Sequence, residues 1–233
     1  MFNAAAQGKR CLVFTTLSEP ALKLIRHMQL FSFFDEALLD DQIDFVDLGD
    51  LVRQAPENAG ATIAARAEAF APDFVAIDSF RALCDMLSTD RFLFEARSLV
   101  ESLQAKRVVF DSLSSMAIGV SSERRFKELV YSIAKHMRRT ETTVVMTLEA
   151  EQIIGSGTLT GDGISFVADT LIQLRYLEID GKLERALSVL KARGTHHVSE
   201  LRALTITRDG FRVSDRPFDN LRGVLTGVPT RTQ

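Results

Sequence analysis

Five short segments in the first 150 residues are almost wholly apolar. They are rich in valine, isoleucine, leucine and phenylalanine, so they predict β-strands. Because their apolar residues run continuously, we expect helices to cover both faces of the sheet, as in parallel sheets. The predicted strands are residues 11–17, 43–48, 74–78, 107–111 and 142–148.

Longer segments between these strands carry apolar residues three and four positions apart, which is the spacing of one helix face. Strands and helices that alternate in this way indicate an α/β fold with a mainly parallel sheet. Helices are predicted over residues 20–34, with an inner face of Leu22, Leu24, Ile25, Met28 and Phe31; over 61–70; over 80–104; and over 121–139, with an inner face of Phe126, Leu129, Val130, Ile133 and Met137.

The pattern changes after residue 150. Residues 151–165 contain four glycines and no lysine or arginine, and they are typical of a loop. Strand-like segments with Asp-Gly turns between them follow and predict antiparallel hairpins. We therefore expect one domain over residues 1–233, with an α/β core over residues 1–150 and a β-rich extension over 151–233. The predicted strands of the extension are residues 170–179, 184–193, 201–207 and 210–214.

Composition excludes several classes of protein. The chain has no apolar run of about 18 residues, so no membrane span is expected. Two cysteines, four scattered histidines and no C-x-x-C motif argue against a disulfide framework or a structural zinc site and suit a reducing cytoplasm. A net charge of −3 gives no electrostatic reason to bind nucleic acid.

Two segments 33 positions apart, residues 72–83 and 105–116, are both strand-Asp-Ser-helix units. Either consecutive βα units simply look alike, or one unit is a duplicate inserted in the core. In each, an apolar strand ends in an aspartate, Asp78 or Asp111, as in a Walker B strand whose carboxylate holds Mg²⁺. Aspartate also caps helices that follow strands, so capping alone is an equal alternative at either position.

The segment LKARGTHH, residues 190–197, carries two cations on one predicted strand. Lys191 and Arg193 are two positions apart, so both side chains point to the same face. Lysine as a point charge and arginine as a fork are suited to binding a phosphate. A solvated strand edge explains the same pattern equally well.

The segment GKR at residues 8–10 is similar to the end of a phosphate-binding loop, G-x-x-x-x-G-K-[ST]. The match fails at two required positions, where Asn3 replaces the first glycine and Arg10 replaces the final serine or threonine. We interpret GKR as a turn.

The residues together resemble a known family, the KaiC group of RecA-like ATPases. RVVFDSLSS resembles its Walker B strand and TTVVMT the next core strand. Residues 169–197, 204–210 and 227–232 are similar to the second, autokinase domain of that group. The resemblance implies a RecA-like P-loop NTPase core with a C-terminal antiparallel β extension.

The resemblance implies roles for residues at matching positions. Lys191, Arg193, Thr195 and His197 would reach the nucleotide bound by a neighbouring subunit, with Lys191 and Arg193 acting in trans on the γ-phosphate. Asp111 would be the Walker B aspartate that holds Mg²⁺ through water, and Asp78 is the alternative.

Two positions depart from the family pattern. The family has a Glu-Glu pair after its second core strand, where this chain has Ser18-Glu19, so general-base chemistry would rest on Glu19. The autophosphorylated Ser-Thr pair falls on Ser165-Phe166, and a phenylalanine cannot accept phosphate. Ser165 is then the one candidate phosphorylation site of the pair.

The resemblance also implies that the chain starts after the Walker A loop, with residues 1–7 as the end of a helix that Gly8 caps. We expect a signalling ATPase module with ATP and Mg²⁺ as cofactors and possible serine/threonine autokinase lineage, inactive alone without that loop. Its partners would be copies of itself in a ring, expected to be a hexamer, or intact KaiC-like subunits.

Two alternative functions stay open at this point. One is a non-catalytic pseudo-ATPase that serves as an assembly or scaffold protein. The other is a RecA-like DNA-binding protein. DNA binding is disfavoured because residues 149–174, where such proteins carry their DNA-contacting loops, contain no lysine or arginine.

Overall fold

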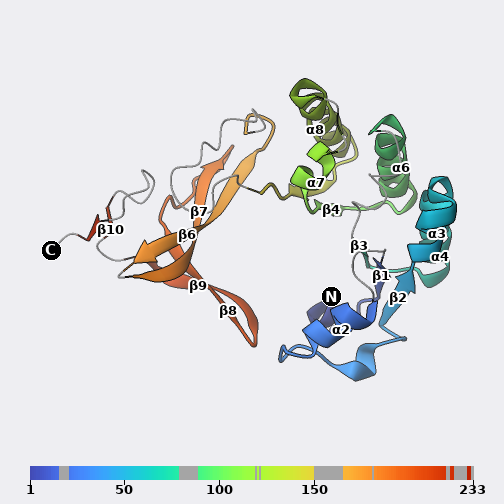
Figure 1. Cartoon of the computed structure of the whole chain (residues 1–233), viewed down its shortest axis with the longest axis horizontal. Coiled ribbons are helices and arrows are strands. Elements are labelled where there is room, and N and C mark those ends of the chain that lie inside the picture. Colours follow the sequence, from blue (N-terminus) through green and yellow to red (C-terminus); the bar gives the residue numbers. More distant parts are fainter. Residues whose placement is uncertain are drawn as a thin grey trace. The chain divides into compact units, whose positions relative to one another are not determined.

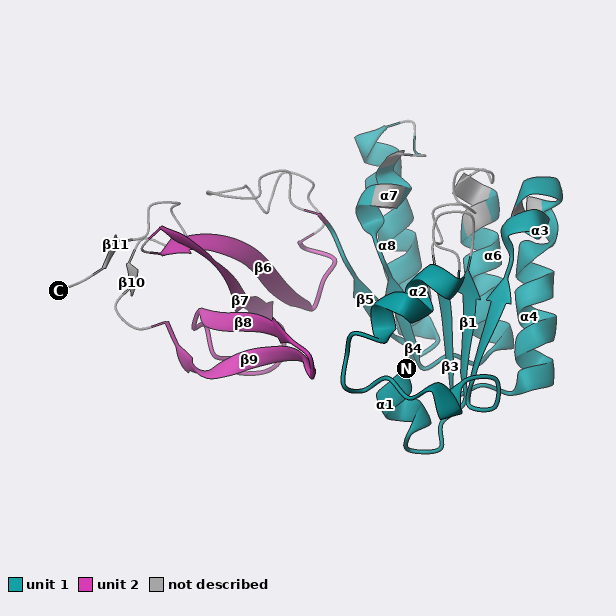
Figure 2. Cartoon of the chain, turned by 60° about the horizontal axis from the view of Figure 1, so that its bottom comes forward, with its two compact units in different colours: residues 1–148 teal, residues 149–233 magenta. Residues whose placement is uncertain are grey.

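The computed structural model of the chain is shown in Figure 1. It describes residues 1–15, 21–78, 89–118, 120, 122–149, 165–179, 181–218, 221–222 and 230–231. The chain divides into two compact units, residues 1–148 and 149–233 (Figure 2).

A three-stranded parallel sheet forms the centre of the first unit. Its strands are β1 (Cys11–Thr15), β2 (Ile43–Asp47) and β3 (Phe74–Asp78), in the order β2-β1-β3. Every residue of the central strand β1 is buried, because neighbouring strands flank it and apolar clusters cover both its faces. The predicted parallel α/β arrangement is confirmed here, and the bounds of β2 and β3 agree with the sequence pattern to within one residue. Residues 16–17 of the first predicted strand lie outside the described residues.

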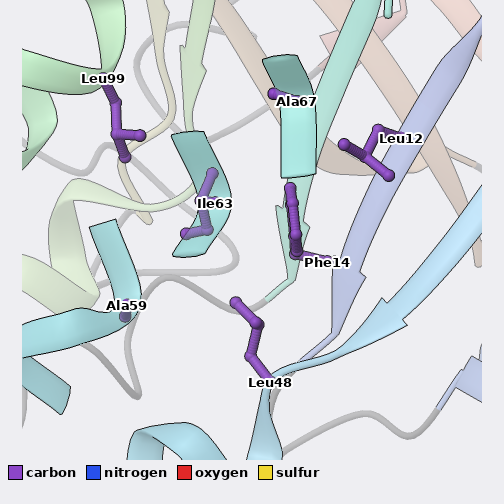
Figure 3. Close-up of a cluster of buried hydrophobic side chains, with 7 residues drawn as sticks. All are labelled: Leu12, Phe14, Leu48, Ala59, Ile63, Ala67 and Leu99. Carbon is purple, nitrogen blue, oxygen red and sulfur yellow. The ribbon is translucent and has the colours of Figure 1, made fainter. Parts of the chain in front are cut away.

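Helix α4 (Ala59–Phe70) covers one face of this sheet, and α6 (Thr89–Ser102) lies against α4. The apolar cluster between these elements draws its side chains from β1, from the end of β2 and from both helices, as Figure 3 shows. Its buried members are Leu12, Phe14, Leu48, Ala59, Ile63, Ala67 and Leu99.

The opposite face of the sheet is covered by α1 (Phe2–Ala5) and by the segment that contains α2 (Ala21–Met28). The pattern predicted a longer helix, over residues 20–34, with Leu22 on its inner face. That prediction is wrong at Leu22, whose side chain is 72% exposed, and the helix ends at Met28. Leu24 and Met28 do pack against the core.

The N-terminal segment supports the interpretation of GKR as a turn. Gly8 has a φ of +79°, in the left-handed region that favours glycine. The Gly8 N–H donates to the Ala5 carbonyl and the Lys9 N–H to the Ala4 carbonyl, which is the hydrogen-bond pattern of a Schellman cap. Lys9 pairs with Asp73 at 2.8 Å, so its ammonium is tied to the start of β3.

Three short helical segments, which the sequence pattern did not predict, complete the connections of the central sheet. They are the 3₁₀ turns η1 (Glu36–Leu38) and η2 (Pro56–Asn58) and the helix α3 (Gly49–Gln54). The Asp35 carboxylate accepts the Ala37 N–H, so this side chain caps η1.

A second parallel sheet contains β4 (Arg107–Phe110) and β5 (Thr143–Met146). Among the described residues β4 and β3 are not hydrogen-bonded partners, so the predicted single sheet is divided in two. The expectation that both faces are covered is wrong for β4 and β5. Val109 is 64% exposed and Val145 is 53% exposed, because no described element packs over the face that carries them.

Helix α8 (Glu123–Arg139) packs on β5 and on the short helix α7 (Leu113–Ile118). The Ser122 hydroxyl accepts the Arg125 N–H and caps the helix. The predicted inner face is confirmed, since all five of its apolar residues are buried: Phe126, Leu129, Val130, Ile133 and Met137.

The second unit is a four-stranded antiparallel sheet in the order β6-β7-β8-β9, as the Asp-Gly turns predicted. Gly181 and Gly210, with φ values of +72° and +99°, provide the left-handed residues of its two tight hairpins. The strands are β6 (Thr170–Ile179), β7 (Lys182–Ala192), β8 (Arg202–Thr207) and β9 (Gly210–Pro217), followed by the short pair β10 (Leu221–Arg222) and β11 (Thr230–Arg231).

No helix in the described parts of the chain is long and apolar enough to cross a bilayer.

Candidate functional site

The carboxyl ends of β1, β2 and β3 meet at one edge of the central sheet. Thr15, the last residue of β1, is in register with Asp47 on one side and with Asp78 on the other. The Thr15 side chain is 0% exposed, and its hydroxyl has no hydrogen-bond partner among the described residues. A buried hydroxyl without a partner is costly, so Thr15 has the capacity for one further hydrogen bond at this edge.

Asp47 is one of the two aspartates at this edge. Its Oδ1 accepts the Gly49 N–H at 2.7 Å, so the carboxylate forms an Asx turn just before α3. Asp47 was not among the predicted site residues, although IDFVD ends in aspartate just as FVAID and RVVFD do. The same pattern that found Asp78 and Asp111 could therefore have found it.

Oxygen ligands at this edge suit Mg²⁺, which in nucleotide sites takes one or two protein carboxylates and completes its shell with water and phosphates. The described residues hold no group of three or more His, Cys, Asp or Glu that could bind a metal without such help. Glu19, the predicted general base, follows Thr15 by four positions and lies outside the described residues.

Asp111 follows β4 at the edge of the second sheet. Its Oδ1 accepts a hydrogen bond from the Thr147 hydroxyl, which lies just past the end of β5. The Thr147 N–H donates to the Phe110 carbonyl at 3.0 Å, and the Thr147 carbonyl accepts the Leu113 N–H at 2.8 Å. Thr147, which the sequence analysis missed, thus ties Asp111 to the neighbouring strand and to the start of α7.

Lys191, near the end of β7, and Arg193, just after it, both reach one turn of the same chain. The Lys191 ammonium donates to the Ser165 and Ala168 carbonyls, each at 2.8 Å. The Arg193 guanidinium donates to the Phe166 carbonyl at 3.0 Å. The sequence offered two interpretations of these cations, a phosphate site and a solvated strand edge. Contacts with backbone carbonyls of the same chain belong to neither.

Arg193 makes two further contacts with Asp169. Its guanidinium lies 3.6 Å from the Asp169 carboxylate, and its backbone N–H donates to the Asp169 carbonyl at 2.9 Å. Both acidic and basic side chains of this pair are more than half exposed, so the ion pair itself contributes little to stability.

Thr195 and His197 follow a turn at Gly194, whose φ is +73°. Thr195 is exposed, and its hydroxyl donates to the His196 carbonyl at 3.3 Å. His197 is half-buried. Their predicted contact with a neighbouring subunit's nucleotide stays a prediction.

Ser165, the candidate phosphorylation site, is half-buried, and the Phe166 side chain beside it is exposed. The backbone of both residues is fixed by the two cations of β7. Phosphorylation of Ser165 stays a prediction.

The family of the chain follows from comparison with known proteins. A family model described as "ATPase: KaiC" matches residues 1–217. The chain belongs to the KaiC ATPase family. The resemblance drawn from the sequence motifs is therefore confirmed.

Individual KaiC proteins are similar to this KaiC-family chain over most of its length. The circadian clock oscillator proteins KaiC of Thermostichus vulcanus and of Nostoc sp. are each 31% identical over 183 residues, which is 76% of this chain and 35% of the relative. The chain thus spans about a third of the length of the curated relatives that it matches.

A solved structure has the same fold. The crystal structure of a KaiC-like protein from the archaeon Pyrococcus horikoshii OT3 is similar with a TM-score of 0.58 and 24% identity, and the match covers 91% of this chain and 80% of that one. The predicted α/β core with a C-terminal antiparallel extension is confirmed by the strand arrangement and by this likeness in fold.

Proposed function

We propose that this KaiC-family chain is a module of a ring-forming signalling ATPase, with two places at which it contacts a Mg²⁺-nucleotide. The first is the acidic edge at Thr15 and Asp78, next in sequence to Glu19. The second is the cationic end of β7, which faces a nucleotide held by another subunit. The observation that carries the proposal is the buried Thr15 hydroxyl, which has no hydrogen-bond partner in the described ranges and belongs to a residue in register with two aspartates.

Asp78 is the better candidate for the magnesium-holding carboxylate. In open α/β sheets, ligands bind beyond the carboxyl ends of the strands. Asp78 ends the strand directly beside β1, from which Ser18 and Glu19 follow, whereas Asp111 ends a strand that pairs with β5. The Asp111 carboxylate also has a structural use, since it accepts the Thr147 hydroxyl.

Magnesium would supply charge neutralisation for the phosphates. In the proposed site Asp78 positions that cation, Glu19 accepts a proton from the attacking nucleophile, and Lys191 and Arg193 offer positive charge to a terminal phosphate. Thr195 and His197 would add polar contacts to the same nucleotide. The residues at the end of β7 would act on a nucleotide held by another subunit, so the proposed site forms only when subunits assemble.

We propose that the 233 residues alone do not hydrolyse ATP. They contain no G-x-x-x-x-G-K-[ST] sequence, and a phosphate loop supplies several hydrogen bonds worth roughly 1.5–3 kcal/mol each when one partner is charged. The same observation favours a second candidate function, a non-catalytic subunit that contributes its cationic edge to an intact KaiC-like subunit. A cytoplasmic location and a six-membered ring are part of the proposal.

Phosphate release and molar mass, measured on the same sample, test the proposal. We expect no ATP-dependent phosphate release above a buffer control, and a mass by light scattering that exceeds the monomer at tens of micromolar protein with MgATP. Mutation of the cationic edge in Lys191→Met/Arg193→Gln should weaken this MgATP-dependent association, whereas the charge-matched control Lys182→Met/Arg208→Gln should leave it intact.

Steady ATP turnover by the chain, abolished in Asp78→Asn but kept in the exposed-carboxylate control Asp41→Asn, would show that the inactivity proposal is wrong. A monomeric mass at every nucleotide concentration would contradict the ring.

A further inference from the structure

Lys191 and Arg193 are held by their own chain in this structure. Three backbone carbonyls of one turn, those of Ser165, Phe166 and Ala168, accept hydrogen bonds from the two side chains at 2.8–3.0 Å. We define these contacts, with the Arg193–Asp169 pair, as the carbonyl latch.

The latch binds a short segment that lies outside any strand. Residues 165–169 form a turn before β6, and the Val167 side chain within it is buried. Two of the three donors of the Lys191 ammonium are used in this way. The cations that would serve a nucleotide therefore already have a structural role.

We propose that the carbonyl latch and a bound polyphosphate compete for Lys191 and Arg193, so that phosphate binding releases the turn at residues 165–169. This inference rests on the proposed function, because it assumes that these cations contact phosphate. It adds a regulatory consequence: the turn that carries Ser165 would be ordered when the neighbouring nucleotide site is empty and released when that site is occupied.

Electrostatics sets the direction of this competition. A phosphoryl oxygen carries a full negative charge and forms a stronger hydrogen bond to a cation than a neutral carbonyl does. A polyphosphate at Lys191 and Arg193 would also approach the Asp169 carboxylate and the three carbonyl oxygens, all of which repel it. Arrangements that keep both sets of contacts are therefore disfavoured.

The accessibility of Val167 reports the state of the latch. In a Cys84→Ser background we would introduce Val167→Cys and measure its rate of reaction with a thiol reagent. Cys11 is buried, and burial raises the pKa of its thiol, so it reacts slowly and contributes little background. Inorganic tripolyphosphate is the probe, and its binding is measured separately by calorimetry.

We expect Lys191→Met to speed the reaction of Cys at position 167 by roughly tenfold, the factor associated with loss of charge-assisted hydrogen bonds. The matched control Lys182→Met removes the same charge at the opposite end of β7, where Lys182 is exposed, and should leave the rate unchanged. Tripolyphosphate should speed the reaction in the protein with an intact latch and have no further effect in Lys191→Met.

Hydrogen exchange in the chain without the cysteine substitution gives a second readout, in case Val167→Cys perturbs the fold. Peptides that cover residues 165–169 should exchange faster with tripolyphosphate. Tripolyphosphate that binds but leaves thiol reactivity and exchange unchanged would overturn the latch and leave the phosphate role of Lys191 standing. Binding that is absent, or that Lys191→Met does not weaken, would overturn both.

Discussion

The two strand-Asp-Ser units of the chain are nearly alike in sequence and differ in their surroundings. Residues 72–79 provide β3, which pairs with the fully buried β1. Residues 105–112 provide β4, which pairs only with β5 among the described residues and exposes Val109. The same apolar strand ending in aspartate therefore lies beside the buried central strand in one case and in a more exposed pair of strands in the other.

The polar residue before each strand shows the same divergence. Asp73 precedes β3, and its carboxylate accepts hydrogen bonds from the Lys9 ammonium and the Arg10 N–H. The equivalent position before β4 is Lys106, whose side-chain ammonium cannot accept a hydrogen bond. Position in the sheet, more than the motif itself, decides what the aspartate at the end of each strand can do.

The largest effect on stability should separate a buried residue of the central sheet from an exposed residue of the second sheet. Phe14→Ala on β1 removes a fully buried ring and should lower the free energy of unfolding by roughly 3–5 kcal/mol. Val109→Ala on β4 should change it by no more than about 0.5 kcal/mol, because the side chain is largely exposed. Urea unfolding curves of both variants would test this, and a large loss in Val109→Ala would show that its face is covered.

A smaller effect on stability should follow from loss of the hydrogen bond between Thr147 and Asp111. Thr147→Val removes the hydroxyl that donates to the Asp111 carboxylate, and we expect a loss of about 0.5–1.5 kcal/mol. In an Asp111→Ala background the same substitution should have a much smaller effect, since the hydrogen bond is already gone. Equal effects in both backgrounds, measured as a double-mutant cycle, would mean that the pair contributes nothing.

The smallest effect should be a pH dependence at Asp73. The Lys9 side chain, and then the Arg10 N–H, lower the pKa of this carboxyl below its ordinary value of 3.8. Because the pKa is lower in the folded state, the ionised carboxylate stabilises the fold at pH values above its ordinary pKa. That stabilisation is lost as the pH falls through the folded-state pKa. The stability difference between wild type and Asp73→Asn should therefore shrink as the pH falls below 3.8. A difference that stays constant would exclude the ionised carboxylate as its source.

Local patterns predicted most of the fold because the relevant interactions are local. Continuous apolar runs found the parallel strands, and the spacing of Phe126 and Met137 found the buried face of α8. The division of the sheet between β3 and β4, and the exposure of Leu22, depend on which distant elements are present to cover a surface. Such information is not contained in the periodicity of a single segment.

The candidate site was predicted in its residue types and less well in its contacts. Asp78, Asp111, Lys191 and Arg193 were found because charged residues next to apolar strands stand out in the sequence. The hydrogen bond of Thr147 and the carbonyl latch were missed, because a hydroxyl and a backbone carbonyl carry no such signal. Thr15 was missed for the same reason.

The most direct test of this account is which aspartate holds the metal. Mn²⁺ can replace Mg²⁺ as a spectroscopic probe, and its binding to the chain in the presence of ATP can be measured by electron paramagnetic resonance. We expect Asp78→Asn to weaken Mn²⁺ binding at least roughly tenfold, as expected for the loss of a charged ligand, while Asp111→Asn and the exposed control Asp41→Asn retain it. Binding that is lost in Asp111→Asn and kept in Asp78→Asn would place the metal at the β4 edge and contradict the account.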